Sequence, residues 1–253
     1  MDLNKLVIGI SPTKKLYLDD PYLKESVATV LISKQEKKNI YVILDKSIYH
    51  PKGGGQPTDL GFLRGDDFNI DLKKVMEVRG VLVHFGKLNG RLPQTGEEIY
   101  CSLDWKRRNL VMKLHTAGHV LDYALKEVYG KVVDTLGALH GPPVAFTEYR
   151  GTSPSMEQIE AIQERANKIV RDGRKVRFIY VNRDGLMMAA KDAPNIDRLP
   201  KAERYRLVVI EGVNAIPCTG THVKNTAEIG TIEVRGVERT ERGFKLYYAV
   251  RDM

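Results

Sequence analysis

Four residues that can bind a transition metal stand in two pairs with the same spacing. His115 and His119 form the first pair, and Cys218 and His222 form the second. Imidazole nitrogens and a thiolate sulfur are ligands that Zn²⁺ prefers, and four of them fill a tetrahedral shell. A histidine pair on a helix is often only part of a surface or a core, but the second pair favours a metal site. The sequence therefore predicts a zinc site at His115, His119, Cys218 and His222.

The chemistry of such a zinc ion stays open at this point. Four protein ligands close the shell of a structural zinc, whereas a catalytic zinc keeps one position open for water. A covalent nucleophile at Cys218 is a further alternative, which we disfavour because a thiolate bound to zinc has its lone pair occupied. The sequence shows no motif of a Ser-His-Asp triad or of another Cys-His pair that would suggest nucleophilic catalysis.

A long amphipathic helix is expected to carry the first pair. Residues 104–129 have one apolar stripe, and Gly130 follows as the expected C-terminal cap. Residues four apart on a helix lie one turn apart, so both histidines can reach one ion. The second pair follows Pro217 and encloses Gly220, which predicts a turn after a strand. The apolar stripe consists of Leu110, Leu114, Leu121, Leu125 and Val128.

The rest of the chain predicts an α+β fold in two parts. Residues 1–103 contain short β-branched runs with glycine turns, which indicates a small β-barrel or sandwich, and residues 104–253 mix helices and strands. In the first part we expect strands at 26–33, 39–45, 75–78, 81–85 and 98–103. In the second part we expect helices at 104–129, 155–171 and near Leu186, strands at 176–181 and 206–210, and a hairpin at 230–250. The 155–171 helix begins with a capping box, Ser155 and Gln158.

Composition narrows the class of protein and of partner. The chain has 253 residues, of which 42% are hydrophobic and 28% charged, as in ordinary globular proteins. No run is long and apolar enough to cross a membrane, and the first residues lack the pattern of a signal peptide. Two cysteines make no disulfide scaffold, so we expect a reducing cytoplasm. The net charge of +8 favours a polyanionic partner such as nucleic acid, the alternative being a solvated basic surface.

Two further motifs precede the zinc ligands, and a third extends from the second ligand pair. A glycine-rich turn spans residues 50–61 (HPKGGGQPTDLG), residues 104–108 read DWKRR, and residues 218–230 read CTGTHVKNTAEIG. In this order they resemble the editing portion of alanyl-tRNA synthetases, and most of all its freestanding relatives, the AlaX proteins. The resemblance covers about residues 25–250 and implies an editor of the medium or long type, since the chain is too short for an aminoacylation domain as well.

The resemblance implies a zinc-dependent hydrolase that deacylates mischarged alanine tRNA, with serine, glycine or both as the amino acid removed. The family's ligand pattern falls on the four residues named above. Two positions depart from the family: Thr219 replaces a common glycine, and Thr135 stands where the synthetases usually have a glutamine. We expect the pocket to include Gly54, Gly55, Gln56, Asp59, Thr116 and Thr135.

Basic residues next to these motifs are expected to contact tRNA phosphates. They are Lys106, Arg107 and Arg108 before the helix and Lys224 after the second pair. Two other functions remain: a non-catalytic RNA-binding module stabilised by zinc, and a zinc hydrolase for a small ester or amide without nucleic acid. Salt-sensitive binding of tRNA and turnover of charged tRNA separate the three. Both a monomer and a homodimer are compatible with the sequence.

Overall fold

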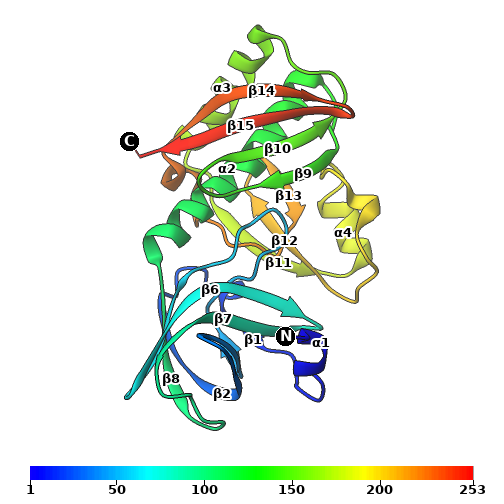
Figure 1. The fold of residues 1–253 in the computed structure, drawn as a ribbon. Coiled ribbons are helices and arrows are strands. Elements are labelled where there is room, and N and C mark those ends of the chain that lie inside the picture. Colours follow the sequence, from blue (N-terminus) through cyan, green and yellow to red (C-terminus); the bar gives the residue numbers. More distant parts are fainter. Residues whose placement is uncertain (253) are drawn as a thin grey trace. The chain divides into compact units, whose positions relative to one another are not determined.

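Six antiparallel strands close into a barrel in the first part of the chain (Figure 1). The computed structural model describes residues 1–252. Around the barrel the strand order is β2-β3-β7-β6-β5-β8, and every neighbouring pair is antiparallel. The strands are β2 (Glu25–Glu36), β3 (Asn39–Leu44), β5 (Gly61–Gly65), β6 (Phe68–Val78), β7 (Val81–Gly90) and β8 (Glu98–Leu103). The predicted barrel is confirmed.

The barrel is filled by alternate side chains because successive residues of a strand point to opposite faces. In β8, Ile99, Cys101 and Leu103 point inward and are buried in the barrel core. Arg79 and Gly80 form the turn between β6 and β7, and both residues have positive φ angles, as a tight hairpin requires. Short elements complete this part: α1 (Leu3–Leu6), β1 (Lys14–Lys15), η1 (Leu16–Leu18) and β4 (Lys46–Ser47), of which β1 and β4 pair in parallel.

One histidine is sealed in the wall of the barrel. His84 of β7 is fully buried; its Nδ1 lies 3.2 Å from the Val42 carbonyl and its Nε2 lies 2.8 Å from the Ser47 hydroxyl. The carbonyl can only accept, so Nδ1 carries the proton and Nε2 accepts from Ser47. Burial lowers the pKa of His84 to about 4. The folded barrel therefore holds this imidazole in its neutral form.

Helices and two further sheets make up the second part of the chain. One sheet has the order β14-β15-β10-β9 and the other β11-β12-β13. The helices are α2 (Trp105–Tyr129), α3 (Met156–Arg171) and α4 (Arg183–Ala189), with short turns η2 (Ile196–Arg198) and η3 (Thr226–Ile229). The strands are β9 (Thr135–Leu139), β10 (Ala145–Arg150), β11 (Val176–Val181), β12 (Tyr205–Ile210), β13 (Asn214–Pro217), β14 (Thr231–Thr240) and β15 (Gly243–Arg251).

The helix predicted to carry the first histidine pair is α2. The Asp104 carboxylate accepts from the Arg107 amide at its start, and Gly130 follows its end with φ of 68°. Leu114, Leu121 and Leu125 of the predicted stripe are buried. Two strands of the same sheet form hydrogen bonds with α2. Tyr149 of β10 donates to the Asp122 carboxylate, and Tyr248 of β15 donates to the Leu114 carbonyl. None of the described helices is both long and apolar enough to cross a membrane.

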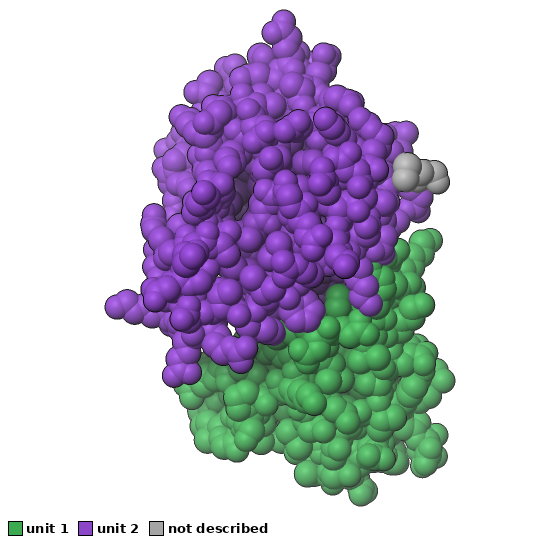
Figure 2. Space-filling model, turned by 180° about the vertical axis from the view of Figure 1, so that it is seen from behind, with its two compact units in different colours: residues 1–53, 57–109 green, residues 54–56, 110–253 purple. Residues whose placement is uncertain are grey.

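The chain divides into two compact units, which Figure 2 shows in two colours. Unit 1 comprises residues 1–53 and 57–109, and unit 2 comprises residues 54–56 with the chain from Leu110 onward. The tripeptide 54–56 of the glycine-rich turn thus belongs with the helices and sheets of unit 2. The sequence-based boundary at residue 104 stays a prediction, while the units divide within α2.

Candidate metal centre

The four predicted ligands come together in unit 2. His115 and His119 lie one turn apart on α2, while Cys218 and His222 lie in the loop after β13, as expected from Pro217 and Gly220. One ligand atom from each residue can be chosen so that all four lie within 4.8 Å of one another. The three histidines are buried and Cys218 is partly exposed.

The distances between these atoms fit a tetrahedral zinc ion. Cys218 Sγ lies 3.5 Å from His115 Nε2 and 3.4 Å from His222 Nε2. Zinc–sulfur bonds of about 2.3 Å and zinc–nitrogen bonds of about 2.0 Å at tetrahedral angles place sulfur and nitrogen about 3.5 Å apart. His119 Nε2 is buried without a hydrogen bond, as a nitrogen reserved for a metal would be. The residues present therefore fit zinc.

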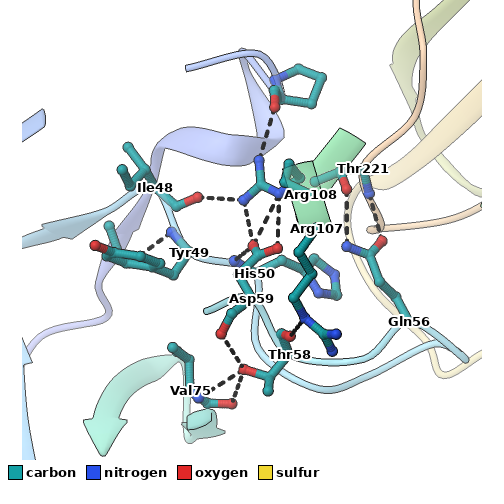
Figure 3. A network of polar contacts seen from close by, with 12 residues as sticks. Ile48, Tyr49, His50, Gln56, Thr58, Asp59, Val75, Arg107, Arg108 and Thr221 are labelled. Carbon is teal, nitrogen blue, oxygen red and sulfur yellow. Dashed lines mark hydrogen bonds and ion pairs between the residues drawn. The ribbon is translucent and has the colours of Figure 1, made fainter. Parts of the chain in front are cut away.

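A glutamine from the glycine-rich turn orients His115. The Gln56 oxygen accepts from the Thr221 amide at 2.9 Å, and the Gln56 Nε2 donates to the Thr221 hydroxyl (Figure 3). The same oxygen faces His115 Nδ1 at 2.9 Å. Because the Thr221 amide can only donate, the oxygen of Gln56 must be the atom between them. His115 Nδ1 therefore carries the proton, and His115 Nε2 is left as the ligand atom.

The other two imidazoles have partners of their own at Nδ1. The Thr116 hydroxyl donates to the Met112 carbonyl at 2.8 Å, so it accepts from His222 Nδ1, which lies 3.2 Å away. The Asp122 carboxylate lies 3.5 Å from His119 Nδ1. His115 and His222 thus present Nε2 to the centre, each held by a group on a different residue. Neither nitrogen of His119 has a hydrogen bond, and the Asp122 carboxylate beside Nδ1 favours Nε2 as its ligand atom.

The electrostatics of the cluster favour a cation. Burial acts against protonation of His119, but the Asp122 carboxylate and the Cys218 sulfur raise the pKa of His119 to about 9. Burial also opposes ionisation of Cys218, yet the His119 imidazole and the Gly220 amide lower the pKa of this thiol. Groups that stabilise a proton here stabilise a metal ion as well.

Two glycines allow the close approach of the ligand rings. A Cβ atom on Gly220 would lie 2.2 Å from the His115 ring, and one on Gly118 would lie 2.7 Å from the His140 ring. Both distances are far shorter than side chains tolerate, so Gly118 within the His-x-x-x-His pair and Gly220 within the Cys-x-x-x-His pair are required by packing.

A pocket of about 650 Å³ opens beside the cluster within unit 2. Three of the four ligands, His115, His119 and Cys218, lie in its lining, and His222 does not. The other walls come from residues 54–55, the β9 strand, the segment between α4 and β12, and the end of β13. A metal ion in the cluster would therefore form part of the pocket surface.

Sequence reasoning missed His140, a buried histidine of the pocket lining. Its ring stacks on the His115 ring with centroids 4.5 Å apart, and its Nδ1 lies 2.6 Å from the Tyr248 hydroxyl. Since Tyr248 donates to the Leu114 carbonyl, His140 Nδ1 donates to Tyr248, and His140 Nε2 keeps its lone pair. Burial and the nearby His119 lower the pKa of His140 to about 3. No spacing marks this residue, because it belongs to no motif.

Three of the predicted substrate-binding residues line the pocket, namely Gly54, Gly55 and Thr135. The structure does not place the other three there. Gln56 and Thr116 are fully buried and hold His115 and His222 from behind, as described above. Asp59 is buried in unit 1, where it binds the His50 amide.

The structure corrects the prediction made for Arg108. The sequence predicts a phosphate contact, but the Arg108 side chain is 0% exposed and forms an ion pair with Asp59 in unit 1 (Figure 3). Its remaining donors bind the carbonyls of Pro21 and Ile48. All three guanidinium nitrogens are engaged, so this residue stabilises unit 1 and does not face a polyanion.

The other three basic residues remain candidates for phosphate contact. Lys106 and Lys224 are exposed, and Arg107 is partly exposed, with its Nε donating to the Thr58 carbonyl.

Comparisons with known proteins place the chain among relatives that act on alanine tRNA. A family model described as tRNA synthetases class II (A) matches residues 22–107, and one described as threonyl and alanyl tRNA synthetase second additional domain matches residues 205–244. The alanyl-tRNA editing protein AlaX-L of Pyrococcus horikoshii is 36% identical over 221 residues, which are 87% of this chain and 54% of that protein. The alanine–tRNA ligase of Sulfurisphaera tokodaii is 33% identical over 257 residues, 100% of this chain and 28% of the ligase. The ligase of Thermoplasma acidophilum is 34% identical over 235 residues, 89% and 25% respectively. The chain thus spans about half of the editing protein and about a quarter of the ligases.

Proposed function

Because the chain belongs to the family of AlaX editing proteins and the matching part of alanine–tRNA ligases, we propose that it hydrolyses the ester of mischarged alanine tRNA. The observation that carries the proposal is the ligand cluster in the wall of a pocket (His115, His119, Cys218 and His222). The substrate is seryl-tRNA, and glycyl-tRNA is the second one to test. Since such substrates arise where translation takes place, we propose the cytoplasm as the location.

The donor set and the pocket both support ester hydrolysis. Zinc bound to these ligands supplies a Lewis acid, which polarises a carbonyl or a water molecule. A pocket of about 650 Å³ lies within the range of about 300–1,000 Å³ that small-molecule sites occupy. It can therefore hold the amino acid together with the terminal nucleoside of tRNA.

Residues of the chain itself orient the substrate beside the metal. His140 is neutral, and its Nε2 accepts a hydrogen bond from the α-ammonium group of the amino acid. The hydroxyl of Thr135 in the pocket wall contacts the serine side chain. Gln56, Thr116 and Asp122 keep the three imidazoles in place.

A non-catalytic RNA-binding module remains the second candidate. It is favoured by the four protein ligands, which suffice to close a tetrahedral shell as in structural zinc sites. In that case the protein binds tRNA and leaves the ester intact.

The decisive experiment measures hydrolysis of alanine tRNA charged separately with serine, glycine and alanine. We expect seryl-tRNA to be deacylated and alanyl-tRNA to be spared. The double variant Cys218→Ala, His222→Ala should lose its zinc, measured by elemental analysis, together with the activity. Binding of charged tRNA without any turnover would support the second candidate, and a full zinc equivalent in the double variant would refute the ligand assignment.

A further inference from the structure

An asparagine outside every sequence motif contacts the predicted specificity residue. Asn195 lies in the pocket lining, in the segment between α4 and β12. Its Nδ2 donates to the Thr135 carbonyl at 2.8 Å and to the Thr135 hydroxyl oxygen at 2.5 Å. Two polar groups of one residue are therefore bound by a single amide.

The direction of these hydrogen bonds follows from the carbonyl. A carbonyl oxygen accepts and never donates, so the NH₂ end of the Asn195 amide must face Thr135. The Thr135 oxygen then accepts from Asn195, and its own hydrogen must point elsewhere. Within residues 1–252 the Thr135 hydroxyl donates to no protein acceptor. Thr135 is thus left as a donor for a group in the pocket.

Asn195 makes this contact in an unfavourable conformation, which indicates that the contact has a function. The backbone of Asn195 is left-handed, with φ of 58°. Its side-chain oxygen is buried without a hydrogen bond. An unsatisfied buried acceptor is unfavourable, and such groups gather at functional sites. Arg198 Nη1 donates to the same Thr135 carbonyl at 3.4 Å and not to the Thr135 hydroxyl.

We propose that Asn195 is a positioning residue that makes the Thr135 hydroxyl a donor toward the substrate, so that the pocket selects an amino acid whose side chain carries an oxygen. This inference rests on the proposed ester hydrolysis. Serine provides the acceptor oxygen, whereas alanine and glycine leave the Thr135 donor unpaired. The site therefore prefers serine over glycine as well as over alanine, because a polar group that loses its water without gaining a partner is penalised.

The first test reverses the amide's polarity. In Asn195→Asp the carboxylate accepts the Thr135 hydrogen and turns it away from the pocket. We expect kcat/KM for seryl-tRNA to fall by about tenfold to a hundredfold, with the rates for glycyl- and alanyl-tRNA nearly unchanged. Asp197→Ala, at an exposed position of the same segment, is the control and should keep the wild-type preference. An equal loss for all substrates would mean a merely structural role and would overturn the inference.

A double-mutant cycle with Thr135→Val isolates the contact. If Asn195 acts through Thr135, then Asn195→Ala should reduce serine preference in the wild-type background and have no further effect beside Thr135→Val. Additive losses of serine preference would overturn the inference.

A binding experiment separates this inference from the proposed function. Calorimetry of the zinc-loaded protein with non-hydrolysable amide analogues of seryl-, glycyl- and alanyl-adenosine needs no turnover and no folded variant. We expect the seryl analogue to bind about tenfold tighter or more than the other two. If the wild type hydrolyses no charged tRNA but shows this preference, the proposed function fails and the hydroxyl-binding site stands. Equal affinities for the three analogues would refute the site even where seryl-tRNA is hydrolysed.

Discussion

At the scale of single residues, Gln56 is a side chain that is not a ligand itself but whose removal should weaken metal binding. It is fully buried, and its oxygen holds the proton of His115 Nδ1 in place. Loss of such a partner lowers metal affinity by about 10–100-fold. We therefore expect Gln56→Leu to bind zinc about 10–100-fold more weakly in competition with a chromogenic chelator.

The matched control is Gln56→Glu, which keeps an oxygen acceptor for His115 and loses the donor to Thr221. It should keep most of the zinc affinity. Titration with cobalt, followed by visible absorption, should give the same order of metal affinity: wild type, then Gln56→Glu, then Gln56→Leu. Equal affinities of the wild type and Gln56→Leu would mean that His115 is held by its helix alone.

Residue types and spacing are enough to predict the four ligands, because each pair is local in the chain. The surrounding groups are not predictable in the same way. His140 and Asn195 reach the pocket through the pairing of strands and the path of a loop, which no local pattern records. Asp122, in contrast, lies three residues after His119 on α2, a helical spacing that the sequence does show. The sequence marks Gln56 only as a substrate contact, since its turn gives no sign that residues 54–56 belong with unit 2.

At the scale of elements, the sealed histidine of β7 makes the barrel sensitive to acid. The pKa of His84 is lowered to about 4 in the folded chain, against about 6.5 in an unfolded one. Below about pH 6.5, His84 binds a proton in the unfolded chain but not in the folded barrel. The free energy of unfolding therefore falls as the pH drops toward 4. Above that pH the contribution is constant.

We expect His84→Gln to remove this pH dependence. Between about pH 7 and about pH 4.5, the free energy of unfolding of the wild type should fall by about 2 kcal/mol more than that of the variant. Urea unfolding followed by the fluorescence of Trp105, the single tryptophan, reports on unit 1. Parallel losses of stability in the two proteins would show that another group is responsible.

Elements with a strong period are predictable, and short irregular ones are not. The 155–171 helix is marked by its capping box and apolar face, and the structure contains both. Sequence reasoning missed β9 and β10 because a glycine interrupts the first and two prolines separate them, so neither shows an alternating run. It predicts a turn after a strand at Pro217 but gives no bounds for that strand, β13, which has only four residues.

At the scale of the whole molecule, the net charge of +8 predicts salt-dependent binding of tRNA. Lys106 and Lys224 are exposed lysines within two of the sequence motifs. Each phosphate contact that is lost reduces the slope of log K against log salt by about 0.7 to 0.9. We expect Lys106→Ala, Lys224→Ala to reduce the slope accordingly. Lys87→Ala, an exposed lysine of the barrel, should leave it unchanged. A double variant with the wild-type slope would place the phosphate contacts elsewhere.

Because Cys101 is buried in the barrel core, the reactivity of Cys218 alone can report whether the metal site is occupied. Burial raises the pKa of this thiol to about 12, so it should not react with a disulfide reagent in the folded state. Cys218, the other free cysteine, is a proposed metal ligand. A chromogenic disulfide reagent should therefore find no thiol in the loaded protein, one after chelation and two after unfolding. Two fast thiols in the native protein would contradict this. The number of reactive thiols then equals the number of empty metal sites, and loss of the metal leaves the partly exposed Cys218 sulfur open to oxidation.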